Sequence, residues 1–321
     1  MVGSIALRTA GSALALALLT GCAGEPPATA ADDPAAAMIE REIPAPGFAD
    51  FLAVDGDSVW VTNRGRVEKW AVGGKLAEFA MPRPCGTMAI AEGSLWVANC
   101  TGANVYRIDL AKAELQAIVA TGLADPRGET NVVHGAGSVW VASDPAGKVA
   151  RIDPATNAVI AEIAVAPETA FLAFGFDALW AVSSKQQVLQ RIDPETNVVT
   201  GTAPLGKQPG FLAAGEGAVW VQEQGDGTVA RVDPASLEVT GRTKVGANLL
   251  YGDIDTGGGA VWLRTTDEQT MVVIDPASLA IRARLGKAAG SGAVRYTPQG
   301  VWTSAHDNQT ISWWTGPSAT P

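Results

Sequence analysis

Two charged residues near the C-terminus stand where the sequence otherwise repeats small apolar side chains. Asp255 lies seven residues before Trp262, and the next unit places Arg295 at the same distance before its own tryptophan, Trp302. The five equivalent positions elsewhere in the chain are small and apolar: Ala53, Ala89, Val133, Ala173 and Ala213. Asp253 precedes Asp255 by two residues, so an extended strand would direct both carboxylates to one side. Such a cluster either forms a buried ion pair or binds a polar ligand.

The sequence offers few residues for metal or nucleophilic chemistry. It has two histidines, His134 and His306, and three cysteines. Zinc, haem and iron–sulfur sites need more of these ligands, so we expect neither a metal nor a cofactor. The 33 acidic residues outnumber the 23 basic ones and give a net charge of −10. Because phosphate backbones repel such a chain, we do not expect nucleic acid as a partner.

The tryptophans belong to a repeat that predicts the fold. One copy of the repeated phrase is Gly137-Ser138-Val139-Trp140-Val141. The seven copies centre on Trp60, Trp96, Trp140, Trp180, Trp220, Trp262 and Trp302, with gaps of 36, 44, 40, 40, 42 and 40 residues. A period of about forty residues is that of a four-stranded propeller blade. We therefore predict an all-β, seven-bladed β-propeller over residues 38–316.

Alternation and turn residues place four strands, A to D, in each unit. In the fifth copy, residues 211–214 form strand A, a Glu216-Gly217 turn follows, and residues 218–221 form strand B. An Asp-Pro pair ends strand C at 153–154, 193–194, 233–234 and 275–276. Asp and Pro favour a tight turn, so these aspartates are predicted to be structural rather than catalytic.

The last unit is one strand short, and the N-terminus supplies a matching segment. After residues 311–314, the third strand of the seventh copy, only seven residues remain. Residues 38–43 have the pattern of a fourth strand and precede the first strand A. We expect this strand to complete the last blade, with Ile39 and Ile43 packing on it, because closure removes an exposed sheet edge.

The repeated phrases resemble those of a known superfamily. Gly137-Ser138-Val139-Trp140-Val141 and residues 149–157 (VARIDPATN) are similar to the secreted seven-bladed propellers of the YVTN-repeat and streptogramin B lyase-like superfamily, over residues 38–316. A lyase of this type would be expected to present a histidine base and metal-binding acids at the funnel mouth. His306 maps there, but His134 maps near the far end of its strand, about 17 Å away. The resemblance therefore implies the fold, while the histidine pattern argues against the lyase activity.

The connections from strand D to A and from B to C should share one face, which we call the loop face. This face carries the varied side chains expected of a recognition surface. The predicted ligand-binding residues there are Arg127, Glu129, Glu223 and His306, with Asp253, Asp255 and Arg295 bordering the central funnel. A plain solvated rim is the alternative for each of them. The expected partner is a protein or a small polar ligand.

The hairpin between strands A and B also predicts a disulfide. In the second copy, pairing outward from the Glu92-Gly93 turn places Cys85 directly opposite Cys100. Opposed residues of an antiparallel pair lie within disulfide range. An exported protein would meet an oxidising compartment, which favours the bond.

The N-terminus predicts export and a lipid anchor. Residues 1–21 have one arginine and a short apolar run, which is typical of a signal peptide. The run ends in Leu19-Thr20-Gly21-Cys22, which resembles a bacterial lipobox with Cys22 as the acylated residue. Residues 22–37 are an Ala/Pro-rich tether and residues 317–321 a short tail. We expect the protein on a bacterial membrane, facing the periplasm or the cell exterior, with no membrane contact beyond the anchor.

These observations favour a binding function over catalysis. We predict a monomeric, lipid-anchored propeller that binds its ligand through the loop face. The alternative is a lyase or hydrolase of the streptogramin B lyase-like type that acts at the central funnel, with His306 and nearby acids as its candidates.

Overall fold

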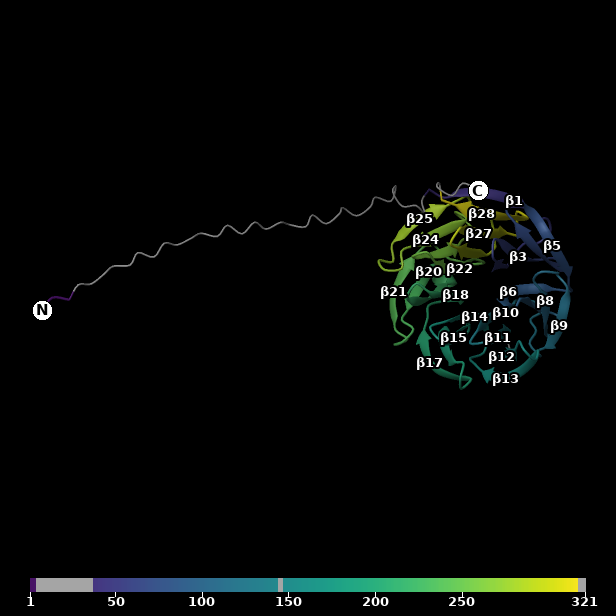
Figure 1. Ribbon diagram of the computed structural model, residues 1–321, viewed down its shortest axis with the longest axis horizontal. Helices are drawn as coiled ribbons and strands as arrows, with labels where there is room; N and C mark the ends of the chain where they lie inside the picture. Colours follow the sequence, from purple (N-terminus) through teal and green to yellow (C-terminus); the bar gives the residue numbers. More distant parts are fainter. Residues whose placement is uncertain (4–36, 144–146, 317–321) are drawn as a thin grey trace.

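Seven four-stranded antiparallel sheets surround a central axis and form a ring (Figure 1). The computed structural model describes residues 1–3, 37–143 and 147–316. The predicted signal peptide, lipidation site Cys22 and most of the tether lie outside these residues. Within the described part of the chain, no helix is long and apolar enough to cross a membrane. A short 3-10 turn, η2, spans Gln224–Asp226.

Each blade runs from an inner strand A to an outer strand D. The A strands are β2 (Leu52–Asp55), β6 (Pro84–Ala91), β10 (Thr130–Gly135), β14 (Thr169–Gly175), β18 (Pro209–Gly215), β22 (Asp253–Gly257) and β26 (Val294–Thr297). The B strands are β3 (Ser58–Asn63), β7 (Ser94–Asn99), β11 (Ser138–Ser143), β15 (Ala178–Ser183), β19 (Ala218–Glu223), β23 (Ala260–Arg264) and β27 (Gly300–Ala305). The C strands are β4 (Arg66–Ala71), β8 (Asn104–Asp109), β12 (Lys148–Asp153), β16 (Val188–Asp193), β20 (Thr228–Val232), β24 (Met271–Ile274) and β28 (Thr310–Thr315). The D strands are β5 (Gly74–Ala80), β9 (Leu115–Ala120), β13 (Ala158–Ala164), β17 (Val198–Pro204), β21 (Val239–Lys244), β25 (Ile281–Leu285) and β1 (Ile39–Pro44).

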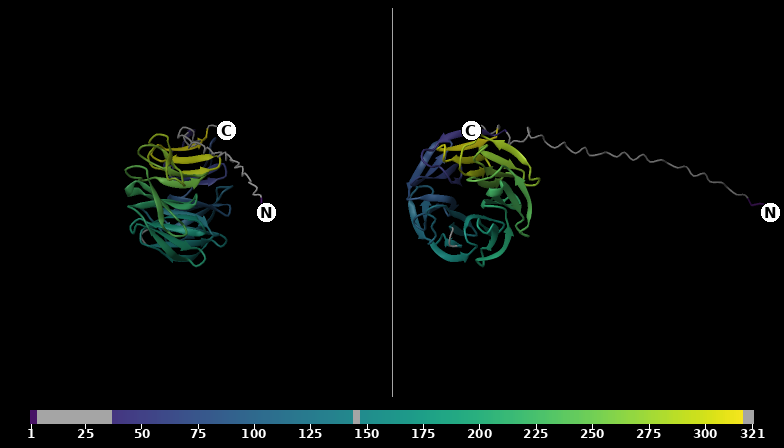
Figure 2. Two further views of the ribbon diagram at one scale, coloured as in Figure 1. Left: turned by 90° about the vertical axis from the view of Figure 1, so that its left-hand side faces the viewer. Right: turned by 180° about the vertical axis from the view of Figure 1, so that it is seen from behind.

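The N-terminal strand β1 closes the ring as predicted. It pairs antiparallel with β28, from Ile39 opposite Thr315 to Pro44 opposite Thr310, and is strand D of the last blade. Figure 2 shows the two ends of the ring side by side. Ile43 is buried, but Ile39 is 62% exposed, so the expected packing of Ile39 is wrong. Ile39 begins β1 opposite Thr315, the last residue of β28, and β1 is the outer strand of this sheet.

The blade tryptophans explain why the repeated phrase is needed. Six of the seven are at most 1% exposed, and Trp262 is 6% exposed. In six of the seven, the indole N–H group bonds to the last residue of strand A in the same blade, as Trp140 Nε1 does to the Gly135 carbonyl at 3.0 Å. Trp180 and Trp220 repeat this bond to Gly175 and Gly215. A buried indole needs such a partner, and the bond fixes the ring between neighbouring sheets.

The Asp-Pro turns form a repeated structural device, which confirms that prediction. Asp153 Oδ1 accepts the Ala155 N–H at 2.9 Å, and its Oδ2 accepts the Thr156 hydroxyl at 2.8 Å. These bonds, the backbone one first, hold the pKa of Asp153 below its usual value. From the preceding blade, Arg107 Nη1 donates to the Pro154 carbonyl at 2.5 Å. Arg151 makes the same bond to Pro194 while lying over the Trp140 ring. The turns therefore join consecutive blades.

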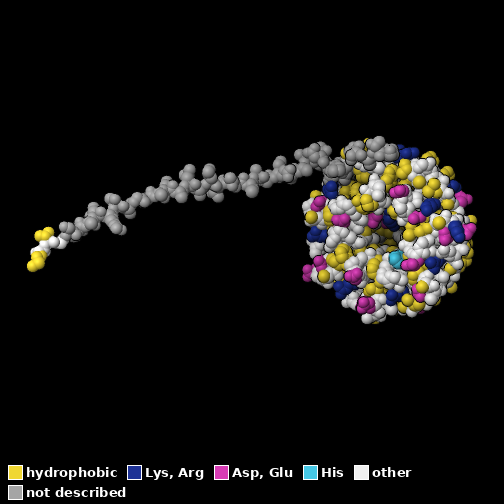
Figure 3. Space-filling model, in the orientation of Figure 1, with side chains coloured by type: hydrophobic (Ala, Val, Ile, Leu, Met, Phe, Trp, Pro, Cys, Tyr) yellow, Lys and Arg dark blue, Asp and Glu magenta, His cyan; other side chains and the backbone are white. Residues whose placement is uncertain are grey.

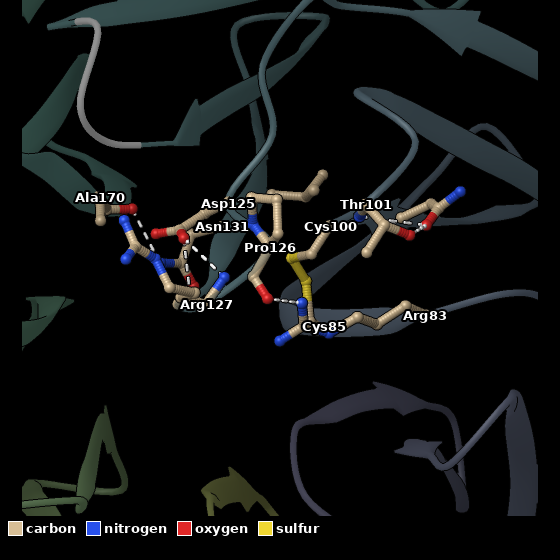
Figure 4. The surroundings of a disulfide bond; sticks show 12 residues. Arg83, Cys85, Cys100, Thr101, Asp125, Pro126, Arg127, Asn131 and Ala170 are labelled. Carbon is tan, nitrogen blue, oxygen red and sulfur yellow. Dashed lines mark hydrogen bonds between the residues drawn. A yellow bond between two sulfur atoms is a disulfide. The ribbon is translucent and has the colours of Figure 1, made fainter.

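The structure confirms the disulfide between Cys85 and Cys100 but corrects its register (Figure 4). The hairpin register changes by two residues between Cys85 and Ala89, so Cys85 lies opposite Ala98 rather than Cys100. The irregularity includes Gly86, whose φ of 70° is in the left-handed region that favours glycine. The two Cα atoms are 6.1 Å apart, still within reach of a disulfide. Similar shifts near the loop face occur in the fourth and fifth blades.

Candidate functional site

A cavity of about 830 Å³ opens at the centre of the loop face. We call it the cup. Figure 3 shows the centre of the ring hollowed in the space-filling view. The cup brings together three of the predicted residues, Arg127, Glu129 and His306, and it is also lined by Cys85 of the disulfide. A volume of this size suits a small-molecule ligand.

Three phenylalanines close the bottom of the cup. Phe51, just before β2, lies 5.9 Å from Phe211 of β18, and Phe171 of β14 meets Phe211 edge-on at 4.6 Å between ring centroids. The three residues come from the first, fourth and fifth blades, so the contact crosses the central axis. Phe171 and Phe211 line both the cup and a second cavity of about 360 Å³ along the axis. The aromatic cluster therefore separates the two cavities, and the cup has an apolar floor.

Two acids stand in the cup wall without a partner in the described chain. Asp50 is held by its backbone, whose N–H donates to the Thr62 carbonyl at 3.1 Å and whose carbonyl accepts from the Ser304 hydroxyl. Glu129 follows a turn in which Asp125 Oδ1 accepts the N–H groups of residues 127 and 128. Within residues 37–143 and 147–316, no group hydrogen-bonds to or ion-pairs with either carboxyl. Both side chains are half-buried in the cavity wall.

Burial and the negative charges nearby keep these two acids protonated to an unusual extent. Burial, then the charges of Asp253 and Asp307, raises the pKa of Asp50 to about 7, although Arg264 opposes the change. Burial, then the charges of Asp50, Asp253 and Asp125, raises the pKa of Glu129 to about 8. Acids shifted this far in a cavity are typical of ligand-binding and catalytic sites.

The predicted charged cluster lines the lower cavity, with a different pairing from the one expected. Arg295 lies opposite Trp302 in the register, and Asp255 lies opposite Trp262, so their equivalent positions are confirmed. Arg295 forms its ion pair with Asp253, at 2.5 Å between Nη1 and Oδ2. Asp255 instead accepts the backbone N–H groups of residues 256 and 296, at 2.9 and 2.8 Å. These carboxylates thus join the sixth and seventh blades, and their role in ligand binding stays a prediction.

A buried arginine that was not among the predicted site residues lies between the cup and the cluster. Arg264 is fully buried and lies opposite Asp253 in the register. Its Nε donates to the Ser304 carbonyl at 3.1 Å and its Nη1 to the Thr270 carbonyl at 3.2 Å, while Nη2 has no partner among the described residues. Burial lowers the pKa of Arg264 to about 10, against the nearby acids that raise it.

The two histidines are not brought together. His306 lines the cup and stacks on Phe48, with 4.1 Å between ring centroids and 21° between planes. Burial lowers the pKa of His306, so the ring is neutral near pH 7. His134 is exposed and lines the lower cavity on the other side of the phenylalanine floor. The predicted separation of the two histidines agrees with this placement.

Glu223 and Arg127 have different surroundings from the two cup acids. Glu223 is fully buried outside the cup, where it accepts from Arg242, from the Thr228 hydroxyl at 2.6 Å and from the Gly206 N–H at 2.6 Å. Burial alone would raise the pKa of Glu223, but these bonds lower it. Its place outside the cup argues for a structural role. Arg127 is exposed at the rim of the cup, beside the disulfide (Figure 4).

The repeat carries a signal for the cup residues that were not predicted. Phe51, Phe171 and Phe211 all lie nine residues before a blade tryptophan. Asp50 lies one position earlier, where the other six copies have small residues: Gly86, Thr130, Ala170, Gly210, Gly252 and Gly292. No group of three or more His, Cys, Asp or Glu side chains suited to a metal ion occurs in the described part of the chain.

The seven sheets, the closing strand and the cup define a seven-bladed β-propeller with a ligand-sized cavity on one face. Solved structures share this architecture. A catalytically inactive histidine-to-alanine variant of virginiamycin B lyase from Staphylococcus aureus, with quinupristin, superposes with a TM-score of 0.75 and 17% identity over 87% of this chain and 99% of that chain. A streptogramin B lyase structure gives 0.74 and 16% over 87% and 98%. The propeller domain of Myceliophteria thermophila Cps50 (Swd1) gives 0.70 and 15% over 86% and 99%.

At these identities the comparisons establish the fold alone. No family model and no curated protein matches the sequence. The predicted resemblance to streptogramin B lyase-like propellers is confirmed at the level of the fold.

Proposed function

We propose that this chain is an exported, lipid-anchored binding protein that holds a ligand in the cup on its loop face, without catalysis of its own. The cup carries this proposal, because it is closed by an aromatic floor and has two partially protonated acids in its wall. Polar groups that the fold leaves without partners are available to a ligand. The closed floor favours a small ligand over a protein segment, although a protein could still cover the rim.

A photocrosslinking experiment tests the binding face. Benzoylphenylalanine is placed at Arg127, on the rim of the cup, and in a matched variant at Asp57, an exposed turn residue between β2 and β3 on the opposite face. After illumination in the producing cell, we expect adducts from position 127 and not from position 57. Mass spectrometry distinguishes a small molecule from a protein. Equal adducts from the two positions, or none from either, would contradict the proposal.

The lipid anchor and the extracytoplasmic location need a separate test. The Cys22→Ser variant should lose the lipid mass and either leave the membrane fraction or stay as the uncleaved precursor. The wild-type protein should carry a diacylglycerol mass on its first mature residue. An unmodified wild-type protein that fractionates as the variant does would rule out the anchor.

A lyase or hydrolase acting at the cup is the alternative. It is favoured by one observation, that His306 and two acids of raised pKa line the same cavity. The solved neighbour that is inactivated by a histidine change is described with quinupristin. Incubation of this protein with quinupristin, followed by mass spectrometry, tests the alternative. A product that forms with wild type and not with His306→Ala would replace the binding proposal with an enzymatic one.

A further inference from the structure

We propose that the ligand of the cup is a monovalent organic cation that carries an aromatic or bulky apolar group. The cationic centre lies between Asp50 and Glu129, and the apolar group rests on the phenylalanine floor. This inference depends on the proposed binding function and specifies its ligand chemistry.

The shape of the cup suits such a molecule. The floor is built from the rings of Phe51, Phe171 and Phe211, and a cavity of about 830 Å³ stands above it. Aromatic faces attract organic cations through the ring quadrupole and bury apolar groups at the same time. A small hydrated inorganic ion would gain little from this floor.

The charges around the cup also favour a cation, because the lining has more acids than arginines: Asp50, Asp125, Glu129 and Glu168 against Arg64, Arg83 and Arg127. Arg295 is committed to Asp253, and Arg264 donates to the Ser304 and Thr270 carbonyls. At the rim, Arg83 donates to the Pro126 carbonyl (Figure 4). Asp50 and Glu129 remain without an ion pair in the described chain. A cationic ligand would supply the charge that this wall lacks, whereas an anionic ligand would add to the repulsion.

Binding of the cation should release protons. At pH 7.5 the two acids are partly protonated, with pKa values of about 7 for Asp50 and about 8 for Glu129. A bound positive charge favours the ionised forms and so lowers both pKa values. The charged groups that act on the two acids are Asp253, Asp307 and Arg264 for Asp50, and Asp50, Asp253 and Asp125 for Glu129.

Calorimetry with benzyltrimethylammonium tests the inference, because this probe has no proton to lose. The full exported chain is titrated at pH 7.5 in two buffers of different ionisation enthalpy, with phenylacetate and benzyl alcohol as anionic and neutral comparisons. We expect the cation to bind at least about tenfold more tightly than either comparison. Any proton released comes from the protein.

Variants assign the effect to the cup. Glu129→Gln and Asp50→Asn should each weaken cation binding by about tenfold and reduce the proton release, and Phe211→Leu should weaken binding without changing that release. The matched control is Glu162→Gln, because Glu162 is an exposed acid outside the cup and is paired with Lys148 at 2.8 Å. It should bind as wild type does. Thermal melts confirm that each variant is folded.

The outcomes separate this inference from the proposed function. Any of three results would contradict a cationic ligand. Phenylacetate could bind as tightly as the cation, the cation could fail to bind at millimolar concentration, or wild type and the Asp50→Asn/Glu129→Gln variant could bind it equally. If the rim still gives crosslinked adducts, the cup binds a ligand of another class. If position 127 gives no adduct either, the binding function fails as well.

Discussion

The Asp-Pro turns and the cup both carry carboxylates, but their surroundings shift the carboxyl pKa values in opposite directions. In the turns, Asp153, Asp193 and Asp233 accept backbone N–H groups, which come first among the causes that lower their pKa values. In the cup, burial without a partner raises the pKa values of Asp50 and Glu129. The turns repeat from blade to blade, whereas each cup acid occurs once. Repetition marks the acids that hold the ring together, and departure from the repeat marks those available to a ligand.

Deleting the closing strand should have the largest effect on the repeated framework. Loss of residues 38–43 unpairs β28 and removes the buried Ile43, so we expect a loss on the order of 5 kcal/mol or more in the free energy of unfolding. Denaturant unfolding measures it. Removal of residues 23–35 is the control and should change stability very little. Equal stability of the two truncated proteins would show that ring closure does not depend on this strand.

The ion pair at the lower cavity tests whether a departure from the repeat can also be structural. Arg295→Ala leaves the buried Asp253 carboxylate without its partner and should cost about 3 to 5 kcal/mol. The Asp253→Asn/Arg295→Ala double variant should recover part of this loss, because no charge is then stranded. Arg127→Ala, at the exposed rim, should change stability by less than about 0.5 kcal/mol. Additive losses in the double variant would mean that the two side chains do not interact.

Glu223 and Glu129 form a matched pair of acids for the comparison. Glu223→Ala leaves Arg242, Thr228 and the Gly206 N–H without their acceptor, and we expect a loss of about 2 kcal/mol at pH 7. Because the folded-state pKa of Glu223 is lowered, its stabilisation is present at neutral pH and is lost as the pH falls through that pKa. Glu129→Gln removes no hydrogen bond or ion pair within the described chain and should not destabilise the fold. A larger loss of stability from Glu129→Gln than from Glu223→Ala would mean that Glu129, rather than Glu223, has the structural role.

The repeat predicted the blades, the closing strand and the structural aspartates because each depends on local pattern. The contents of the cup were harder to predict, since they depend on residues from blades that are distant in the sequence. Phe51 and Phe211 meet across the axis, a contact that no single blade specifies. The predicted hairpin register was also wrong near the loop face, where an irregularity at Gly86 shifts Cys85 relative to its partner strand. Glu129 was predicted because the hairpin register places it on the loop face. Asp50 and Arg264 were not predicted, because their positions depend on how the blades pack.

The raised pKa values of the two cup acids should also change the pH dependence of stability. Asp50 and Glu129 have folded-state pKa values above their unfolded values of 3.8 and 4.5, so the unfolded chain ionises them first. Their contribution to the free energy of unfolding is fully present below about pH 4 and is lost as the pH rises to about 8. The melting temperature of wild type should therefore fall more steeply between pH 5 and 9 than that of Asp50→Asn/Glu129→Gln. Parallel curves in scanning calorimetry would contradict this prediction.

Carboxyl titration by 13C NMR tests the contrast between the two kinds of acid most directly. Spectra of protein labelled at the Asp and Glu side-chain carboxyls, assigned with the Asp50→Asn, Glu129→Gln and Glu223→Gln variants, give each midpoint in one sample. The structure predicts midpoints of about 7 for Asp50 and about 8 for Glu129, and a midpoint below 4.5 for Glu223. Midpoints near 4 for all three acids would mean that the cup acids are solvated or paired like the others, and the proposed site would lose its basis.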